Sequence, residues 1–256
     1  PEKRVAIILT NAPGKASKIG NAVGLDTPAS IINLLHDMAT QGYDVGEIPA
    51  DGDALIHTLI DLCSYDTDLM TEAHIAQANG VKLGTYKSWF ETFPEKNKTQ
   101  MSARWNGATN EVYFYDDELK FAGLTLGNVF IALQPPRGYG IDPDTIYHMP
   151  DLPPTHHYAA FYSWLRNEQR VDAIIHMGKH GTLEWLPGKG VGTANDSYPE
   201  LLLQDLPLIY PFIINDPGEG MQAKRRAHAV IIDHLMPPMT SAETYCDLEE
   251  LQQLVD

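Results

Sequence analysis

Short apolar runs alternate with amphipathic stretches along the chain. Residues 5–10 form a branched apolar run that closes in Asn11-Ala12-Pro13-Gly14, which predicts a buried strand followed by a turn. Asp26-Thr27-Pro28 predicts a helix start, and apolar residues at helical spacing continue from there to Gly42. A second helix is expected over residues 52–63.

Residues 65–121 follow a less regular pattern that is rich in Trp, Tyr, Lys and Asn. We interpret this part as a mainly helical insertion or lid. The chain is therefore expected to consist of a first α/β part (1–64), the insertion (65–121) and a second α/β part (122–256).

The second part returns to apolar runs separated by amphipathic stretches. Strands are expected at 124–134, 171–176, 208–214 and 229–233, and helices at 155–168, 198–203 and 219–226. Strands that alternate with helices are typical of a mostly parallel sheet with helices on both faces. The predicted fold class is therefore α/β and Rossmann-like.

Four of the expected strands end in polar turns that contain glycine. These turns cover residues 10–14, 134–138, 176–181 and 215–220. The carboxyl ends of parallel strands lie at one edge of a sheet, and ligands bind in the crevice there. His176, His180, Asn215 and Glu219 are thus expected near one another, provided that their strands are neighbours.

Composition narrows the class of protein. The 256 residues include 34 Asp and Glu against 18 Lys and Arg, and the resulting net charge of −16 opposes non-specific binding to nucleic acid. With 43% apolar residues the chain can form a full core. No apolar run is long enough to span a membrane. Two distant cysteines, Cys63 and Cys246, suit a reducing cytoplasm. The missing initiator Met and a strand near residue 1 suggest a segment of a longer protein.

The strongest candidate chemistry lies in the turn after the strand at 171–176. His176, His180 and Glu184 follow at intervals of four residues, and Gly178 and Gly181 argue against one continuous helix. An imidazole beside a carboxylate makes a proton acceptor or a pair of metal ligands. The alternative is a structural cluster that caps the end of the strand.

A second candidate covers residues 215–226. Acidic residues open the expected helix and Lys224, Arg225 and Arg226 close it, which complements the helix dipole and is a sufficient structural explanation. The functional alternative is that backbone N–H groups of the turn, or the arginine pair, bind carboxylates of a ligand.

Other features add less. Gly14-Lys15 and Gly188-Lys189 lack the residues of a phosphate loop, so ATP is expected to bind elsewhere. His156 and His157 are expected as exposed residues at a helix start.

Residues 171–188 closely resemble the signature of the large subunit of the cobalt and magnesium chelatases of tetrapyrrole biosynthesis. The resemblance continues through residues 206–220, 222–226 and 230–238, and residues 1–60 also look like the family. Lys179 and the Asn215-Asp216-Pro217-Gly218-Glu219 turn resemble the cobalt branch. Members of this family are several-fold longer, so an internal segment with a chelatase-like fold is expected.

The resemblance implies insertion of Co²⁺ into hydrogenobyrinic acid a,c-diamide in cobalamin biosynthesis, with ATP hydrolysed by separate AAA+ ATPase subunits. The alternatives are the large subunit of a magnesium chelatase, which inserts Mg²⁺ into protoporphyrin IX, and a non-catalytic module that binds a tetrapyrrole or a metal. Imidazole ligands suit Co²⁺ better than Mg²⁺. The isolated segment is expected to be inactive.

Roles can be assigned on this resemblance. His180 and Glu184 are expected to accept protons and relay the metal, with His176 in support, and all three are candidate metal ligands. The expected substrate-binding residues are Lys179, Trp185, Asn215, Glu219, Arg225 and Arg226.

Overall fold

A six-stranded sheet forms the centre of the computed structural model, which describes residues 1–11, 16–20, 22, 25–139, 146, 149–178, 183–211 and 217–232. The strand order is β5-β6-β1-β7-β8-β9. The bounds are Gly123–Leu126 for β5, Val129–Leu133 for β6, Val5–Leu9 for β1, Ala173–Met177 for β7, Leu208–Pro211 for β8 and Val230–Ile232 for β9.

The sheet is mostly parallel, as the sequence predicts. Strand β1 lies between β6 and β7 and pairs with both in parallel, and the series β7, β8, β9 continues in the same direction. Only β5 runs antiparallel, as the outer strand of a hairpin with β6.

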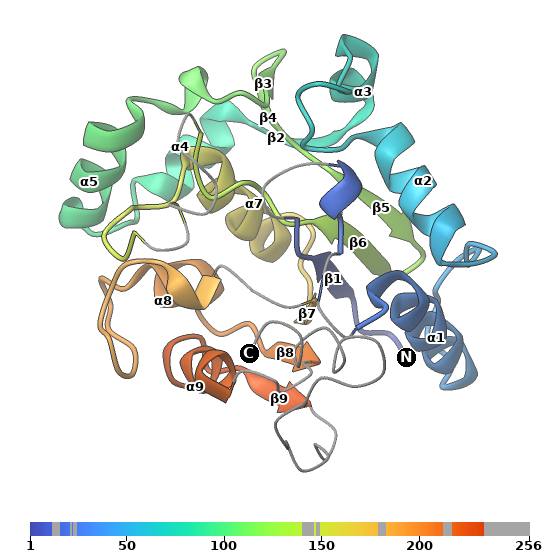
Figure 1. The fold of residues 1–256 in the computed structure, drawn as a ribbon. Coiled ribbons are helices and arrows are strands. Elements are labelled where there is room, and N and C mark those ends of the chain that lie inside the picture. The colour runs from blue at the N-terminus through green and yellow to red at the C-terminus, as the bar shows by residue number, and fades with distance from the viewer. Residues whose placement is uncertain are drawn as a thin grey trace, which may run out of the picture.

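Both faces of the sheet are covered by helices (Figure 1). Val5, Ile7 and Leu9 of β1 point to one face and pack with helices α1 (Thr27–Thr40) and α2 (Gly52–Leu62). Ala6 and Ile8 point to the other face, where α7 (His156–Asn167), α8 (Tyr198–Leu203) and α9 (Pro217–Arg226) pack. This alternation follows from the two-residue period of a strand.

Local signals set several helix starts. The Asp26 carboxylate caps α1 by accepting the Ala29 N–H, and Asp51 caps α2 in the same way. Thr155 caps α7 through the Tyr158 N–H. These boundaries agree with the expected helices to within a residue or two, because capping depends on neighbours in sequence.

The prediction of one continuous strand over residues 124–134 is wrong. This segment is a hairpin in which Leu126 pairs with Val129 across a two-residue turn at Gly127 and Asn128. Gly127 has a φ of +56°, a backbone conformation that glycine adopts without strain. A Gly-Asn pair between apolar runs is a hairpin signal, and it outweighs the continuous apolar pattern.

Residues 65–121 contain the expected helices but also a sheet. The helices are α3 (Glu72–Gln77), α4 (Leu83–Phe90) and α5 (Glu95–Trp105), together with a 3₁₀ turn at Ala108–Asn110. Strands β2 (Asn79–Lys82), β4 (Glu118–Phe121) and β3 (Phe114–Tyr115) form an antiparallel sheet in that order.

This part of the chain packs directly on the central fold. The Phe121 ring lies 5.1 Å from the Trp164 ring of α7, and the Tyr86 hydroxyl lies 2.8 Å from His156 Nδ1. The same apolar cluster contains residues of β1, α7 and the region 65–121. Its role as a lid stays a prediction.

No helix among the residues that the structure describes is long and apolar enough to cross a membrane.

Candidate functional site

Buried polar side chains gather where the parallel strands end. Thr10 and Asn11 follow β1, Gln134 follows β6, and His176 lies near the end of β7; each is at most 6% exposed. Because β6, β1, β7 and β8 are adjacent and parallel, their carboxyl ends lie along one edge of the sheet. The predicted neighbourhood of these strands is confirmed, whereas His180 and Asn215 lie outside the described residues.

His176 lies deep in this edge. It pairs with Ile8 of β1, and its side chain is directed to the face covered by α7. Its Nε2 is 3.0 Å from the Tyr162 hydroxyl, and the residue is 1% exposed. Burial lowers the pKa of His176 to about 4, so the imidazole is neutral at neutral pH. Its Nδ1 has no hydrogen-bond partner among the described residues.

Two tyrosines and a glutamine support this histidine. The Gln134 side-chain amide donates to the Tyr162 oxygen at 3.0 Å and to the Tyr158 oxygen at 3.2 Å. Both tyrosines lie on α7, four residues apart and therefore on one helix face. The sequence analysis did not single out these residues, although a Tyr pair at this spacing and a polar residue after a strand are visible in the sequence.

Glu184 is the most unusual charged group of the site. It lies in the 3₁₀ helix η3 (Leu183–Trp185), is fully buried, and its carboxylate has no partner beyond its own backbone N–H in the described part of the chain. Leaving a buried carboxylate unpaired costs several kcal/mol in order of magnitude. Such a group is a candidate functional residue.

Burial raises the pKa of Glu184 to about 7. The negative charge of Glu219, in the first turn of α9, raises the pKa of Glu184 further. The backbone N–H of Glu184 and the positive charges of Arg137 and Arg226 oppose this rise. A carboxyl group with a pKa near 7 can both accept and release a proton at physiological pH. Glu184, which follows β7, and Glu219, which follows β8, are thus within electrostatic range of each other.

Two arginines hold the backbone around Glu184. Arg226 donates to the carbonyl oxygens of Glu184 at 2.6 Å, Leu186 at 2.7 Å and Lys189 at 3.0 Å. Arg137 donates to the Trp185 carbonyl at 2.9 Å. The Arg226 guanidinium therefore faces the protein's own backbone, and Arg226 does not enter our proposal for substrate binding.

The other predicted site residues differ in accessibility. Arg225 is exposed on α9, Trp185 is half-buried and Glu219 is 5% exposed. Lys179 lies outside the described residues, as do His180 and Asn215. No three His, Cys, Asp or Glu side chains within the described ranges could together hold a metal ion. The predicted set of His176, His180 and Glu184 stays a prediction, because His180 is not described.

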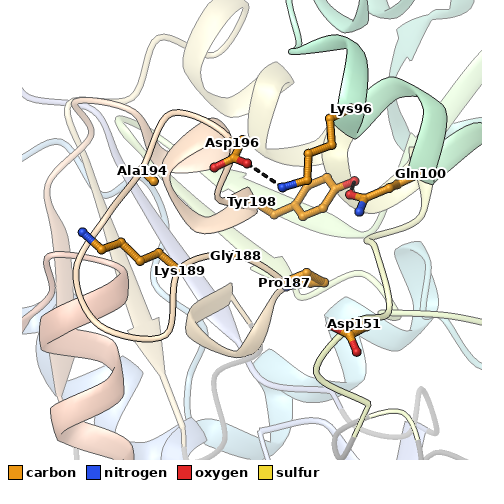
Figure 2. A pocket seen from close by; sticks show the side chains of 9 residues that line it. All are labelled: Lys96, Gln100, Asp151, Pro187, Gly188, Lys189, Ala194, Asp196 and Tyr198. Atoms are coloured by element: carbon orange, nitrogen blue, oxygen red, sulfur yellow. Dashed lines mark hydrogen bonds and ion pairs between the residues drawn. The ribbon is translucent and has the colours of Figure 1, made fainter.

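A surface cavity of about 450 Å³ opens beside the segment that follows Glu184 (Figure 2). It lies between α5 and residues 187–198. Its lining residues are Lys96, Gln100, Asp151, Pro187, Gly188, Lys189, Ala194, Asp196 and Tyr198.

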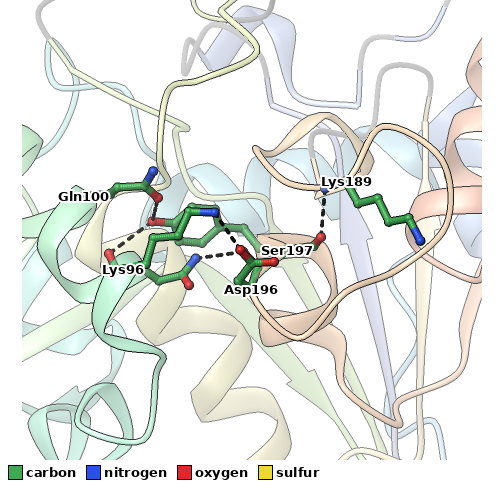
Figure 3. Close-up of polar contacts among 7 residues, drawn as sticks. Lys96, Gln100, Lys189, Asp196 and Ser197 are labelled. Carbon is green, nitrogen blue, oxygen red and sulfur yellow. Dashed lines mark hydrogen bonds and ion pairs between the residues drawn. The ribbon is translucent and has the colours of Figure 1, made fainter.

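Polar contacts join the two walls of this cavity (Figure 3). The Lys96 ammonium lies 2.6 Å from the Asp196 carboxylate, and the Asn97 side chain donates to the Asp196 carbonyl. The Tyr198 hydroxyl donates to the Asn97 carbonyl at 3.1 Å. The region 65–121 is therefore attached to the segment that follows Glu184.

A second polar cluster lies at the start of α7. The Glu111 carboxylate accepts the His156 backbone N–H at 2.7 Å, and burial raises the pKa of Glu111 to about 7. His156 and His157 are 3% and 0% exposed, so the expectation that they are exposed is wrong. Residues of the region 65–121 cover them, which a pattern read along one helix does not reveal.

Three comparisons relate the chain to known proteins. A family model described as CobN/Magnesium Chelatase matches residues 1–256. The aerobic cobaltochelatase subunit CobN of Pseudomonas aeruginosa is 50% identical over 255 residues, which are 100% of this chain and 20% of that protein. The H-type subunit of the magnesium chelatase of Rhodobacter capsulatus is 33% identical over 253 residues, 98% of this chain and 20% of that protein.

A solved structure resembles the fold closely. The catalytic subunit of cobaltochelatase from Mycobacterium tuberculosis superposes with a TM-score of 0.80 at 46% identity, over 99% of this chain and 21% of that one. The chain thus spans about a fifth of the length of the relatives that it matches.

Proposed function

This chain belongs to the CobN/magnesium chelatase family, and we propose that it forms part of a subunit that inserts Co²⁺ into hydrogenobyrinic acid a,c-diamide. Its higher identity to a cobaltochelatase subunit, 50% against 33% for a magnesium-chelatase subunit, supports the cobalt branch. Both relatives are, by their names, subunits of metal chelatases.

The observation that carries the proposal is the buried, unpaired carboxylate of Glu184. Metal insertion requires loss of the N–H protons of the macrocycle and of the water ligands of the cation. A carboxyl group with a pKa of about 7 can take up such protons. Asn11, His176 and Glu184, near the carboxyl ends of the strands, supply polar atoms without protein partners in the part that the structure describes.

The remaining roles follow the sequence prediction. His180 is proposed to act with Glu184 as proton acceptor and metal relay, and Lys179 and Arg225 to meet carboxylates of the macrocycle. ATP is proposed to be hydrolysed by AAA+ ATPase subunits, since the sequence lacks a phosphate loop. A cytoplasmic location is proposed because two distant cysteines suit a reducing compartment.

A magnesium chelatase function is the second candidate, favoured by the 33% identity to a magnesium-chelatase subunit. Titration of the full-length protein with a corrinoid and with protoporphyrin, followed by visible absorbance, separates the two. Tighter binding of the porphyrin would overturn the cobalt assignment. Binding of either macrocycle without any metal insertion would instead indicate a non-catalytic binding module.

The decisive variant is Glu184→Gln in the full-length subunit, assayed with its partner subunits. Glutamine keeps the shape of the side chain but cannot accept a proton, so the rate of metal insertion should fall at least 100-fold. The dissociation constant of the macrocycle should change by less than about threefold, because glutamine has the size and shape of glutamate and keeps one side-chain oxygen as an acceptor.

The matched control is Glu168→Gln, because Glu168 is an exposed glutamate directly after the last residue of α7. This variant should keep the wild-type rate. Unchanged metal insertion by Glu184→Gln would contradict the proposed function of Glu184.

A further inference from the structure

Three polar side chains contact the Tyr162 hydroxyl: Gln134, Tyr158 and His176. Gln134 donates one amide N–H to Tyr162, and Tyr158 also hydrogen-bonds the Tyr162 oxygen. An amide NH₂ is a donor only. The Tyr162 oxygen accepts from Gln134, which allows the Tyr162 hydrogen to point to the third neighbour, His176 Nε2, at 3.0 Å.

The direction of these bonds assigns the tautomer of the imidazole. A neutral imidazole has one nitrogen that accepts and one that carries the proton. When the Tyr162 O–H points to Nε2, that nitrogen accepts and the proton lies on Nδ1. A nitrogen that carries a proton has no lone pair to offer a metal ion.

The Nδ1–H group and the Glu184 carboxylate complement each other. Nδ1 is a buried donor without a partner, and Glu184 is a buried acceptor without a partner beyond its own N–H, within the described residues. Burial, and to a lesser extent the charge of Glu184, raises the pKa of Tyr162, which contacts His176. A water molecule can satisfy both groups, because its oxygen accepts the Nδ1–H and one of its hydrogens is donated to the Glu184 carboxylate.

We propose that His176 acts as a hydrogen-bond donor to an oxygen of the substrate side, a water ligand of the hydrated divalent cation, and that Tyr162 and Gln134 position it in the Nδ1–H tautomer. This inference rests on the proposed function. It replaces the role of metal ligand that the sequence suggested for His176, and it leaves the proposed roles of His180 and Glu184 unchanged.

The first test compares His176→Asn with His176→Leu in the full-length subunit with its partners. The asparagine amide can donate an N–H from the place of Nδ1 but has no imidazole lone pair for a metal. His176→Asn should retain at least a tenth of the wild-type rate of metal insertion, and His176→Leu should lose at least 100-fold. A rate below a tenth for His176→Asn would overturn the proposal.

A second measurement separates donor from ligand without turnover. Equilibrium dialysis against CoCl₂ alone gives the Co²⁺ affinity of the wild type and of His176→Asn. The two affinities should agree within threefold. A tenfold or larger loss in the variant would identify His176 as a metal ligand and overturn the proposal.

The positioning role of Tyr162 is tested by a double-mutant cycle. Tyr162→Phe should lower the rate at least tenfold in the wild-type background but should cost nothing further beside His176→Asn, which has no tautomer to set. Equal losses in both backgrounds would mean that Tyr162 contributes packing only. Far-UV circular dichroism and macrocycle binding check that each variant is folded.

The results for the His176 variants can be judged independently of the result for Glu184→Gln. Full activity of Glu184→Gln would fail the proposed function of that residue, whatever the His176 series shows. An inactive Glu184→Gln together with His176→Asn below a tenth of the wild-type rate would fail the present inference alone.

Discussion

Arg226 connects the end of α9 to the backbone that carries Glu184. The residue is 8% exposed and its guanidinium donates to three carbonyl oxygens, so it supports η3 and the segment after it at three points. A planar group with five N–H donors suits this task better than a lysine. The geometry of Glu184 therefore depends on a residue forty-two positions later in the chain.

We expect Arg226→Met to lower the free energy of unfolding by about 3 kcal/mol, because buried carbonyl oxygens lose a charged donor. The measurement is urea denaturation of the chain. The neighbouring Arg225→Met is the matched control, since Arg225 is exposed, and it should change stability by less than about 0.5 kcal/mol. Equal effects of the two substitutions would contradict the supporting role of Arg226.

The residues of the site were only partly predictable. His176 and Glu184 could be found because polar residues that follow a buried strand reach the ligand edge of a parallel sheet. Tyr162 could not, since its role depends on which helix face meets the end of β7. Arg226 was expected to bind substrate, because its contact with the Glu184 carbonyl spans forty-two residues and cannot be read from the sequence. The spacing of residues along the chain does not show which residues from distant segments meet in the fold.

At the scale of elements, α7 joins the central sheet to the region 65–121. Its first turn receives the Glu111 carboxylate, which also accepts hydrogen bonds from the His157 N–H and from Tyr139. Burial is the largest effect on Glu111 and raises its pKa to about 7, against these hydrogen bonds.

This raised pKa makes stability depend on pH. The folded state holds the Glu111 proton more tightly than the unfolded state, where the pKa is near 4.5, so its stabilisation is complete below pH 4.5 and is lost as the pH rises through 7. Glu111→Gln stays neutral, so its stability relative to the wild type should rise by about 3 kcal/mol between pH 4.5 and 8.

Urea denaturation of both proteins at several pH values checks this expectation. The difference between them isolates Glu111, because Glu184 and the buried histidines titrate equally in each. Glu168→Gln, directly after α7 and exposed, is the matched control for the substitution of a glutamate by glutamine. A constant difference for Glu111→Gln would contradict the expected effect of burial.

Elements with local signals were predicted best. Asp26, Asp51 and Thr155 mark helix starts by capping, and each is readable from the sequence. The sheet of β2, β4 and β3 was missed, because its strands span two to four residues and β2 pairs with a strand far along the chain. Short runs give no reliable two-residue period.

At the scale of the whole molecule, the charged side chains are unevenly distributed along the chain. The chain carries a net charge of −16, and its most basic stretch is the end of α9. Of the three cations there, Lys224 and Arg225 are exposed, whereas Arg226 is buried. Two of the three thus remain accessible to an anionic ligand.

The chain spans about a fifth of the length of its relatives. We expect that the 256 residues alone, mixed with Co²⁺, the macrocycle and ATP, show no metal insertion by visible absorbance. The full-length subunit with its partners is the positive control. Turnover by the chain alone would contradict the proposed need for separate ATPase subunits.

The central position of β1 determines when this sheet can assemble. Val5 pairs with Val129 and with Ala173, so both partners of the first strand are synthesised more than a hundred residues later. Closing loops of this length is entropically costly and slows folding. On the ribosome, the apolar strand β1 therefore stays unpaired until β6 and β7 have been synthesised, and during this time its exposed side chains favour aggregation.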